Sequence, residues 1–295
     1  MDTTLLAEAD AAVDRLLPRF GVPIERRVLE GPSGRLHLLA AGDGPPVVLL
    51  HGGFGGAGNW YRTLGPLARR FRVLAPDRPG FGLSDPPAPD DLSWLDELLA
   101  ALDLRRVALV GHAGGGALAL AYAQARPGAV TALALSDVPL TAPATDSDIR
   151  ARRSPTHPPA PGRRGGRPRR VETWYASLAA RFDDRRLLAP EYLYYLWCLA
   201  RLRPEQDQRP PGEVAPGPVA LPGPGERTWP TVPTLLIWGR SNRWTAVALA
   251  RQLHQRIPDA GLRVIEHSKG IPNLEQPGEF NFAVLNFLAA HLHSG

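Results

Sequence analysis

Residues 107–117 read VALVGHAGGGA, an apolar run followed at once by a glycine-rich turn. The four apolar residues at 107–110 predict a buried strand, and the small residues from Gly114 onward predict the start of a helix. Glycines on both sides of Ala113 allow a turn so tight that this residue is forced into a strained backbone conformation. The segment therefore predicts a strand, a sharp turn and a helix, with Ala113 at the apex.

The same alternation of strand and helix extends along the chain in both directions. Continuous apolar runs are typical of parallel strands that are covered on both faces, and helical periodicity occurs between them. The pattern predicts an α/β fold with a doubly wound, mostly parallel sheet. The expected strands are 35–41, 47–50, 72–75, 107–110, 132–135, 234–238 and 262–265, and the expected helices are 92–102, 117–125 and 246–257.

The alternation breaks at residues 139–231, where two segments rich in Arg, Pro and Gly flank a helical pattern. The flanking segments lack hydrophobic periodicity, so we expect them to be flexible or irregular. Between them, residues 171–203 carry apolar side chains at helical spacing and predict a small helical cap. We therefore expect a core domain in two parts, 1–138 and 232–295, with a cap insertion at 139–231.

Three more motifs surround the turn at Ala113. They read HGGFGG at 51–56, PDRPGFGLSD at 76–85 and PNLEQPGEFN at 272–281. Together the four motifs closely resemble the α/β-hydrolase superfamily over residues 35–137 and 232–292, which implies the α/β-hydrolase fold. The last motif looks most like carbon–carbon bond hydrolases that act on meta-cleavage products, with haloalkane dehalogenases and epoxide hydrolases as more distant relatives.

The resemblance places the three positions of the catalytic triad at residues that cannot perform its chemistry. In this superfamily the tight turn at Ala113 is the nucleophile elbow. Its apex normally presents a Ser, Cys or Asp nucleophile, but Ala113 offers a methyl group. The acid position holds Asn242, whose amide cannot stabilise an imidazolium by charge, and the base position holds Gly270, which has no side chain. The chain is therefore not expected to be an ordinary serine hydrolase.

The anion-binding half of such a site depends on backbone groups and is expected to survive. Its N–H donors are those of Gly53 or Phe54 and of Gly114. His112 is a candidate acid or base, with structural hydrogen bonding in the loop as the alternative. Asp137 follows the strand that carries the triad acid in some relatives, but it has no histidine to orient.

Two residues beside the lost base position are candidate replacements. His267 and Lys269 lie on the loop that would have delivered the histidine, and Lys269 is the only lysine in a chain with 34 Lys and Arg residues. A lysine desolvated in an apolar site acts as a base or a Schiff-base former, whereas the alternative is a pair of solvated loop residues. Aromatic residues that could line the pocket, with plain core packing as the alternative, include Trp60, Trp174 and Trp244.

Composition excludes several other classes of protein. The net charge of +5 is concentrated at residues 150–170 among prolines and glycines rather than aromatics, which argues against nucleic-acid binding. Cys198 is the only cysteine, so no intramolecular disulfide or thiolate cluster can form. No long apolar run or signal peptide is visible, and we expect a cytoplasmic protein without a membrane span, metal or cofactor. A homodimer is left open.

Three functions remain in competition. The first is a cofactor-independent, non-hydrolytic enzyme, such as a cyclase, lyase or isomerase, that acts on a hydrophobic small molecule in an enclosed pocket. The second is a pseudoenzyme that binds a small molecule or a protein partner. The third is an atypical hydrolase of the meta-cleavage-product type whose base and nucleophile come from elsewhere.

Overall fold

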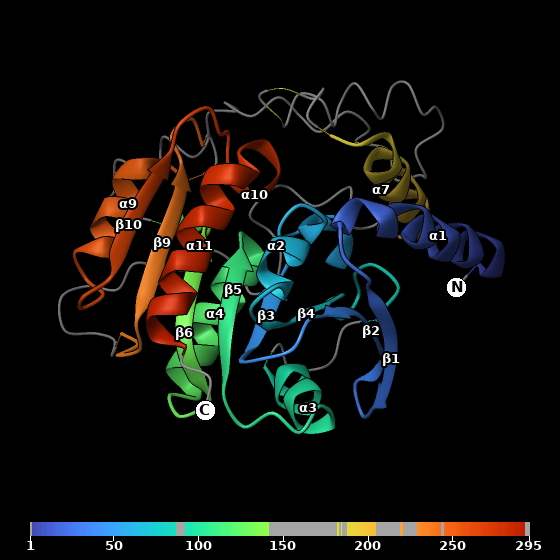
Figure 1. The fold of residues 1–295 in the computed structure, drawn as a ribbon, viewed down its shortest axis with the longest axis horizontal. Helices are drawn as coiled ribbons and strands as arrows, with labels where there is room; N and C mark the ends of the chain where they lie inside the picture. The colour runs from blue at the N-terminus through green and yellow to red at the C-terminus, as the bar shows by residue number, and fades with distance from the viewer. Residues whose placement is uncertain are drawn as a thin grey trace.

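The computed structural model describes residues 2–86, 92–141, 182, 184, 188–204, 219–220, 229–242 and 245–292. An eight-stranded sheet runs through these residues in the order β1-β2-β4-β3-β5-β6-β9-β10 (Figure 1). Strands from β4 to β10 pair in parallel, whereas β2 is antiparallel to both β1 and β4. The strands are β1 Glu25–Gly31, β2 Gly34–Ala41, β3 Pro46–Leu50, β4 Arg72–Pro76, β5 Val107–His112, β6 Val130–Ser136, β9 Thr234–Gly239 and β10 Gly261–Ile265.

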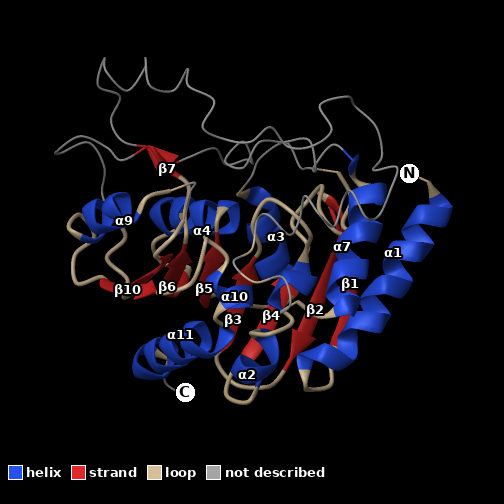
Figure 2. Cartoon of the chain, turned by 90° about the horizontal axis from the view of Figure 1, so that it is seen from above, coloured by secondary structure: helices blue, strands red, loops and turns tan. Residues whose placement is uncertain are grey.

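Helices cover both faces of the sheet and bury a hydrophobic core on each (Figure 2). Helices α3 (Ser93–Ala101), α4 (Gly114–Ala125) and α9 (Val247–His254) pack on one face. The other face carries α2 (Leu64–Ala68) and α11 (Pro277–His291). Coverage of both faces explains why β3, β5 and β6 are apolar without alternation, and it confirms the expected α/β-hydrolase fold.

The sequence pattern missed the first helix and the first strand. Helix α1 (Thr3–Leu16) begins at Asp2, whose side chain accepts hydrogen bonds from the backbone N–H groups of Thr4 and Leu5. Strand β1 reads ERRVLEG and lies at the edge of the sheet, where most of its side chains are exposed or half-buried. Because an edge strand need not be apolar, this strand lacks the apolar run that predicts a buried one.

One helix of the expected cap is described, α7 (Pro190–Leu202), which lies beside α1 (Figure 1). The interface between the two helices is apolar, with Leu5, Val13 and Leu16 of α1 and Leu199 of α7 in the same core. Ion pairs of Arg19 with Glu191 and of Arg201 with Glu8 flank it. Helix α1 therefore holds this part of the cap against the body of the molecule.

Most of the segment expected to form the rest of the cap lies outside the described residues. A two-stranded parallel pair joins β7 (Leu140–Thr141) to β8 (Val219–Ala220). Segment 150–170 and residue Trp174 are not among the described residues, so the domain boundaries at 138 and 232 stay predictions. Within the part of the chain that is described, no helix is long and apolar enough to cross a membrane.

Candidate functional site

Ala113 lies at the apex of the turn between β5 and α4, as the sequence predicted. Its backbone has φ 49° and ψ −120°, a conformation that costs a residue with a Cβ on the order of 1–3 kcal/mol. The flanking glycines are needed for close packing, because a Cβ at Gly115 would lie 2.1 Å from the carbonyl oxygen of Leu50. A Cβ at Gly111 would lie 2.5 Å from the Cα of Gly116. The turn thus has the backbone of a nucleophile elbow and an alanine in place of the nucleophile.

The fold brings the three positions at which the resemblance places the triad, Ala113, Asn242 and Gly270, to the carboxyl ends of β5, β9 and β10. His112 Nε2 lies 2.8 Å from the carbonyl oxygen of Gly270, which ties the elbow to the loop after β10. The N–H of Ser241 donates to the carbonyl of Ser268 over 2.9 Å, which ties that loop to the turn that carries Asn242. The structure thus brings the three loops together, and the assignment of Ala113, Asn242 and Gly270 to the triad positions stays a prediction.

Asn242 pairs with Asp137 inside the protein, and both side chains are buried. The Asn242 Nδ2 donates to Asp137 Oδ1 over 2.6 Å, while the Asn242 Oδ1 accepts the backbone N–H of Thr245 over 3.0 Å. Those two partners fix the orientation of the amide. Asp137 also accepts hydrogen bonds from the backbone N–H of Gly239 and from the hydroxyl of Ser136.

Asp137 differs from an ordinary surface carboxyl in its proton affinity. Burial raises its pKa to about 7, although the hydrogen bonds that it accepts act in the opposite direction. Its backbone φ of 48° places it at a sharp bend directly after β6. A carboxyl with this pKa exists in both protonation states near neutral pH, so Asp137 can exchange a proton there.

The two histidines of the site are structural. Burial lowers the pKa of His112 to about 4, so its imidazole is neutral and its Nε2 proton is donated to Gly270. Burial, with the nearby Arg78 charge, lowers the pKa of His51 to about 3. The His51 Nε2 accepts the backbone N–H of Arg78, and its Nδ1 donates to the carbonyl of Gly52. For His112 this hydrogen bond matches the alternative of structural bonding in the loop, and a role as acid or base stays a prediction.

The two candidate replacements for the lost base do not form a reactive cluster. His267 is exposed at φ 53°, contrary to an inward orientation. Lys269 is half-buried, and its Nζ donates to the carbonyl of Phe182 over 3.3 Å, in a segment of the cap. Its backbone N–H donates to the buried carboxylate of Glu275, which also accepts from Ser268 and Ile271. Glu275, within the motif at 272–281, thus holds this loop in place, a role that no local sequence pattern indicates.

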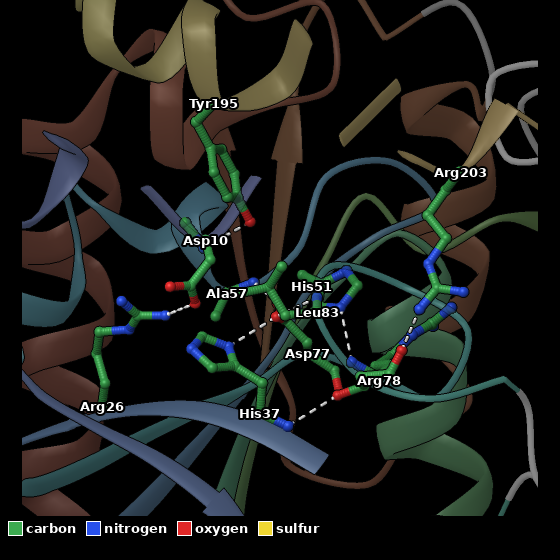
Figure 3. Close-up of polar contacts among 12 residues, drawn as sticks. Asp10, Arg26, His37, His51, Ala57, Asp77, Arg78, Leu83, Tyr195 and Arg203 are labelled. Atoms are coloured by element: carbon green, nitrogen blue, oxygen red, sulfur yellow. Dashed lines mark hydrogen bonds and ion pairs between the residues drawn. The ribbon is translucent and has the colours of Figure 1, made fainter. Parts of the chain in front are cut away.

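Hydrogen bonds to the buried carboxylate of Asp77 fix the loop after β3, which is expected to supply the oxyanion donors. Its carboxylate accepts hydrogen bonds from the N–H of Ala57, the N–H of Leu83 and the Nδ1 of His37, as Figure 3 shows. Burial would raise the pKa of Asp77, but the charge and hydrogen bond of His37 lower it below its usual value. Asp77 therefore stays ionised and fixes the loop.

Of the expected donors, Gly53 and Phe54 are half-buried and Gly114 is buried. Gly114 is the first residue of α4, whose first-turn N–H groups have no carbonyl partner within the helix. Trp60 does not line a pocket, because it is fully buried and packs on Phe280 with ring centres 6.2 Å apart. Trp174 and Trp244 lie outside the described residues. Among the residues that the structure describes, no three His, Cys, Asp or Glu side chains could hold a metal ion.

The sequence is similar to a family model and to named hydrolases. A family model described as alpha/beta hydrolase fold matches residues 45–277. The chain is 28% identical over 284 residues to the 2-hydroxy-6-oxo-6-phenylhexa-2,4-dienoate hydrolase of Burkholderia cepacia, which covers 86% of this chain and 91% of that protein. It is 27% identical over 279 residues to the 2-hydroxy-6-oxononadienedioate/2-hydroxy-6-oxononatrienedioate hydrolase of Comamonas testosteroni, with the same coverage of 86% and 91%.

Among solved structures, the carboxylesterase CesB from Bacillus subtilis superposes with a TM-score of 0.76. The match covers 97% of this chain and 99% of that chain at 21% identity, a likeness that shows the fold alone. The named relatives thus include both meta-cleavage-product hydrolases, as the motif at 272–281 predicted, and esterases.

Proposed function

Because the chain belongs to the α/β-hydrolase family, we propose that it is an atypical member of the carbon–carbon bond hydrolase type that binds a hydrophobic oxo acid. The relative from Burkholderia cepacia is named for a ligand with an apolar group, a ketone and a carboxylate. A ketone of this kind is the group that oxyanion donors recognise. We assign this chain a ligand of the same chemical class, bound with its ketone against the elbow.

The backbone at Ala113 carries the proposal. A residue without a nucleophile has no need of a strained conformation, yet φ 49° and ψ −120° are kept there. The elbow lies close against the loop after β3, since a Cβ at Gly52 would lie 3.2 Å from the Cβ of Ala113, and the first-turn N–H groups of α4 have no carbonyl partner within the helix. The arrangement supports binding of a polarised carbonyl rather than attack on it by the protein.

Without a nucleophile at position 113, no acyl-enzyme can form. Cleavage then proceeds by direct addition of water, in which the water oxygen bonds to the ketone carbon and its proton passes to a base. Asp137 is our candidate for that base, because its raised pKa makes a proton acceptor available near neutral pH. The bond to the neighbouring carbon breaks next, and that carbon takes up a proton. For the ligand named above, the products are benzoate and a five-carbon hydroxydienoate.

A second candidate is a binding protein that performs no chemistry. It is favoured by the loss of all three triad side chains at Ala113, Asn242 and Gly270 rather than one of them. A non-hydrolytic enzyme, such as an isomerase, is the third. All three share the same ligand site and differ only in the fate of the ligand.

The test is titration of the protein with 2-hydroxy-6-oxo-6-phenylhexa-2,4-dienoate, followed by absorbance, and chromatography of the mixture after long incubation. We expect saturable binding and slow release of benzoate. Ala113→Leu would fill the elbow and weaken binding at least about tenfold, because a leucine adds three carbons to a closely packed site. Ala7→Leu, on the exposed side of α1, is the matched control. Binding without products favours the second candidate, an isomeric product favours the third, and absence of binding refutes the proposal.

A further inference from the structure

Asn59, in the short helix η2 (Ala57–Trp60), connects three parts of the molecule that lie far apart in sequence. Its side chain is buried and makes two hydrogen bonds. The Nδ2 donates to the carbonyl of Phe54 over 2.7 Å, and the Oδ1 accepts the hydroxyl of Tyr192 on α7 over 3.0 Å. Its backbone carbonyl accepts a hydrogen bond from the Nδ2 of Asn273 over 3.0 Å, in the short helix α10 (Pro272–Glu275) that follows Gly270.

Two further side chains of helix α7, those of Tyr195 and Leu196, lie against segment 55–58. The hydroxyl of Tyr195 accepts the N–H of Gly58 over 3.3 Å, and Figure 3 shows this side chain reaching from the cap toward Ala57. A Cβ at Gly58 would lie 2.6 Å from the Tyr195 ring, and one at Gly55 would lie 2.9 Å from Leu196. Side chains of α7 thus pack closely against the backbone of this segment at both places.

The orientation of the Asn59 amide follows from its partners. The carbonyl of Phe54 can only accept, so it requires the amide nitrogen, which leaves the amide oxygen for the hydroxyl of Tyr192. A buried amide with both ends satisfied has one stable orientation. If α7 moves away, the oxygen loses its donor, and the amide that holds the Phe54 carbonyl is no longer fixed.

We infer that Asn59 is a positioning residue through which the cap helix α7 sets the geometry of the oxyanion loop at Gly53 and Phe54. Cap position and affinity for a polarised carbonyl are then linked, because the donors are correctly placed only while Tyr192 contacts Asn59. The inference rests on the proposed function for the identity of the ligand, whereas the link between α7 and the loop stands on the hydrogen bonds alone.

Tyr192→Phe is the decisive variant, since it removes only the hydroxyl that Asn59 accepts. Tyr194→Phe is its matched control, because it also removes one tyrosine hydroxyl from α7. The ring of Tyr194 faces Arg15 of α1 instead, with the guanidinium 5.0 Å from the ring centre. Two measurements are made on each protein. One is hydrogen–deuterium exchange of the segment 53–60, and the other is the infrared stretch of the ketone in bound 2-hydroxy-6-oxo-6-phenylhexa-2,4-dienoate labelled with carbon-13.

We expect exchange in segment 53–60 to be about fivefold faster in Tyr192→Phe, the factor that loss of one ordinary hydrogen bond predicts, and unchanged in Tyr194→Phe. In the unaltered protein the ketone stretch shifts to lower frequency on binding, and Tyr192→Phe loses at least half of that shift. Unchanged exchange overturns the inference. Faster exchange with a full frequency shift also overturns it, because the contact is then structural only. If the ketone fails to bind even the unaltered protein, the proposed function is wrong and the exchange result alone decides whether α7 controls the loop.

Discussion

Replacement of Asp137 by asparagine should make the protein more stable, and the gain should grow with pH. The two side chains have the same shape, and the hydrogen bonds around Asp137 allow the exchange. Its Oδ1 accepts from Gly239 and Asn242, which an amide oxygen can also do. Its Oδ2 faces the hydroxyl of Ser136, which can accept a hydrogen bond from an amide nitrogen as readily as it donates one to a carboxylate.

The magnitude follows from the raised pKa. Asp137 changes from an ordinary value of 3.8 to about 7 in the folded protein, roughly three pKa units at 1.36 kcal/mol each, or about 4 kcal/mol in total. Since the folded protein binds this proton more tightly than the unfolded chain does, the stabilisation is complete below pH 3.8 and is lost as the pH rises to about 7. Roughly 3 kcal/mol of the loss falls between pH 5 and pH 8.

The assay is urea denaturation of the unaltered protein and of Asp137→Asn at a series of pH values. Most other titrating groups are common to both proteins and cancel in the difference. We expect the difference in unfolding free energy to rise in favour of Asp137→Asn by about 3 kcal/mol from pH 5 to pH 8. A difference that does not change with pH would refute the reasoning, because it would mean that hydrogen bonds keep Asp137 ionised throughout this range.

Four further outcomes are expected. A fluorophosphonate probe should not label the elbow, since Ala113 has no nucleophilic atom, and an adduct at that residue in a mass spectrum would contradict this. Ala113→Gly should raise the unfolding free energy by about 1 kcal/mol, because glycine accepts a positive φ without strain; a lower melting temperature would argue against strain at the turn. The triple change Ala113→Ser, Asn242→Asp and Gly270→His should restore only weak hydrolysis of p-nitrophenyl esters, because φ at position 270 is 120°, and full activity would show that this loop relaxes. Glu275→Ala should lower the unfolding free energy by about 1–3 kcal/mol in thermal or urea denaturation, since three donors lose their acceptor. Glu275→Gln keeps an acceptor oxygen and should lower the unfolding free energy less. Equal losses in the two variants would show that the charge of Glu275, rather than its hydrogen bonds, stabilises the loop.

Prediction from sequence succeeded where a residue pattern has one local solution. The apolar runs at β3, β5 and β6 could only be strands covered on both faces, and the glycines around Ala113 could only be a tight turn. It failed at β1, where an exposed edge leaves the side chains free to be polar. It left two alternatives open at Trp60, because a large aromatic residue has the same sequence pattern whether it lines a pocket or fills a core, and the structure places this side chain in the core.

By itself, the sequence determined the fold and the residue types at the three expected triad positions, because both depend on which residue occupies each position of a local motif. Tertiary structure alone decided what the replacements do. Asn242 became the partner of Asp137 since β6 and β9 are neighbours in the sheet, 105 residues apart in the chain. His112 donates a hydrogen bond to the carbonyl of Gly270, 158 residues away in the chain. Asn59 connects the cap to the oxyanion loop by accepting a hydrogen bond from Tyr192, which is 133 residues away. Burial and hydrogen bonding of this kind are set by the neighbours that folding supplies, and no local pattern specifies them.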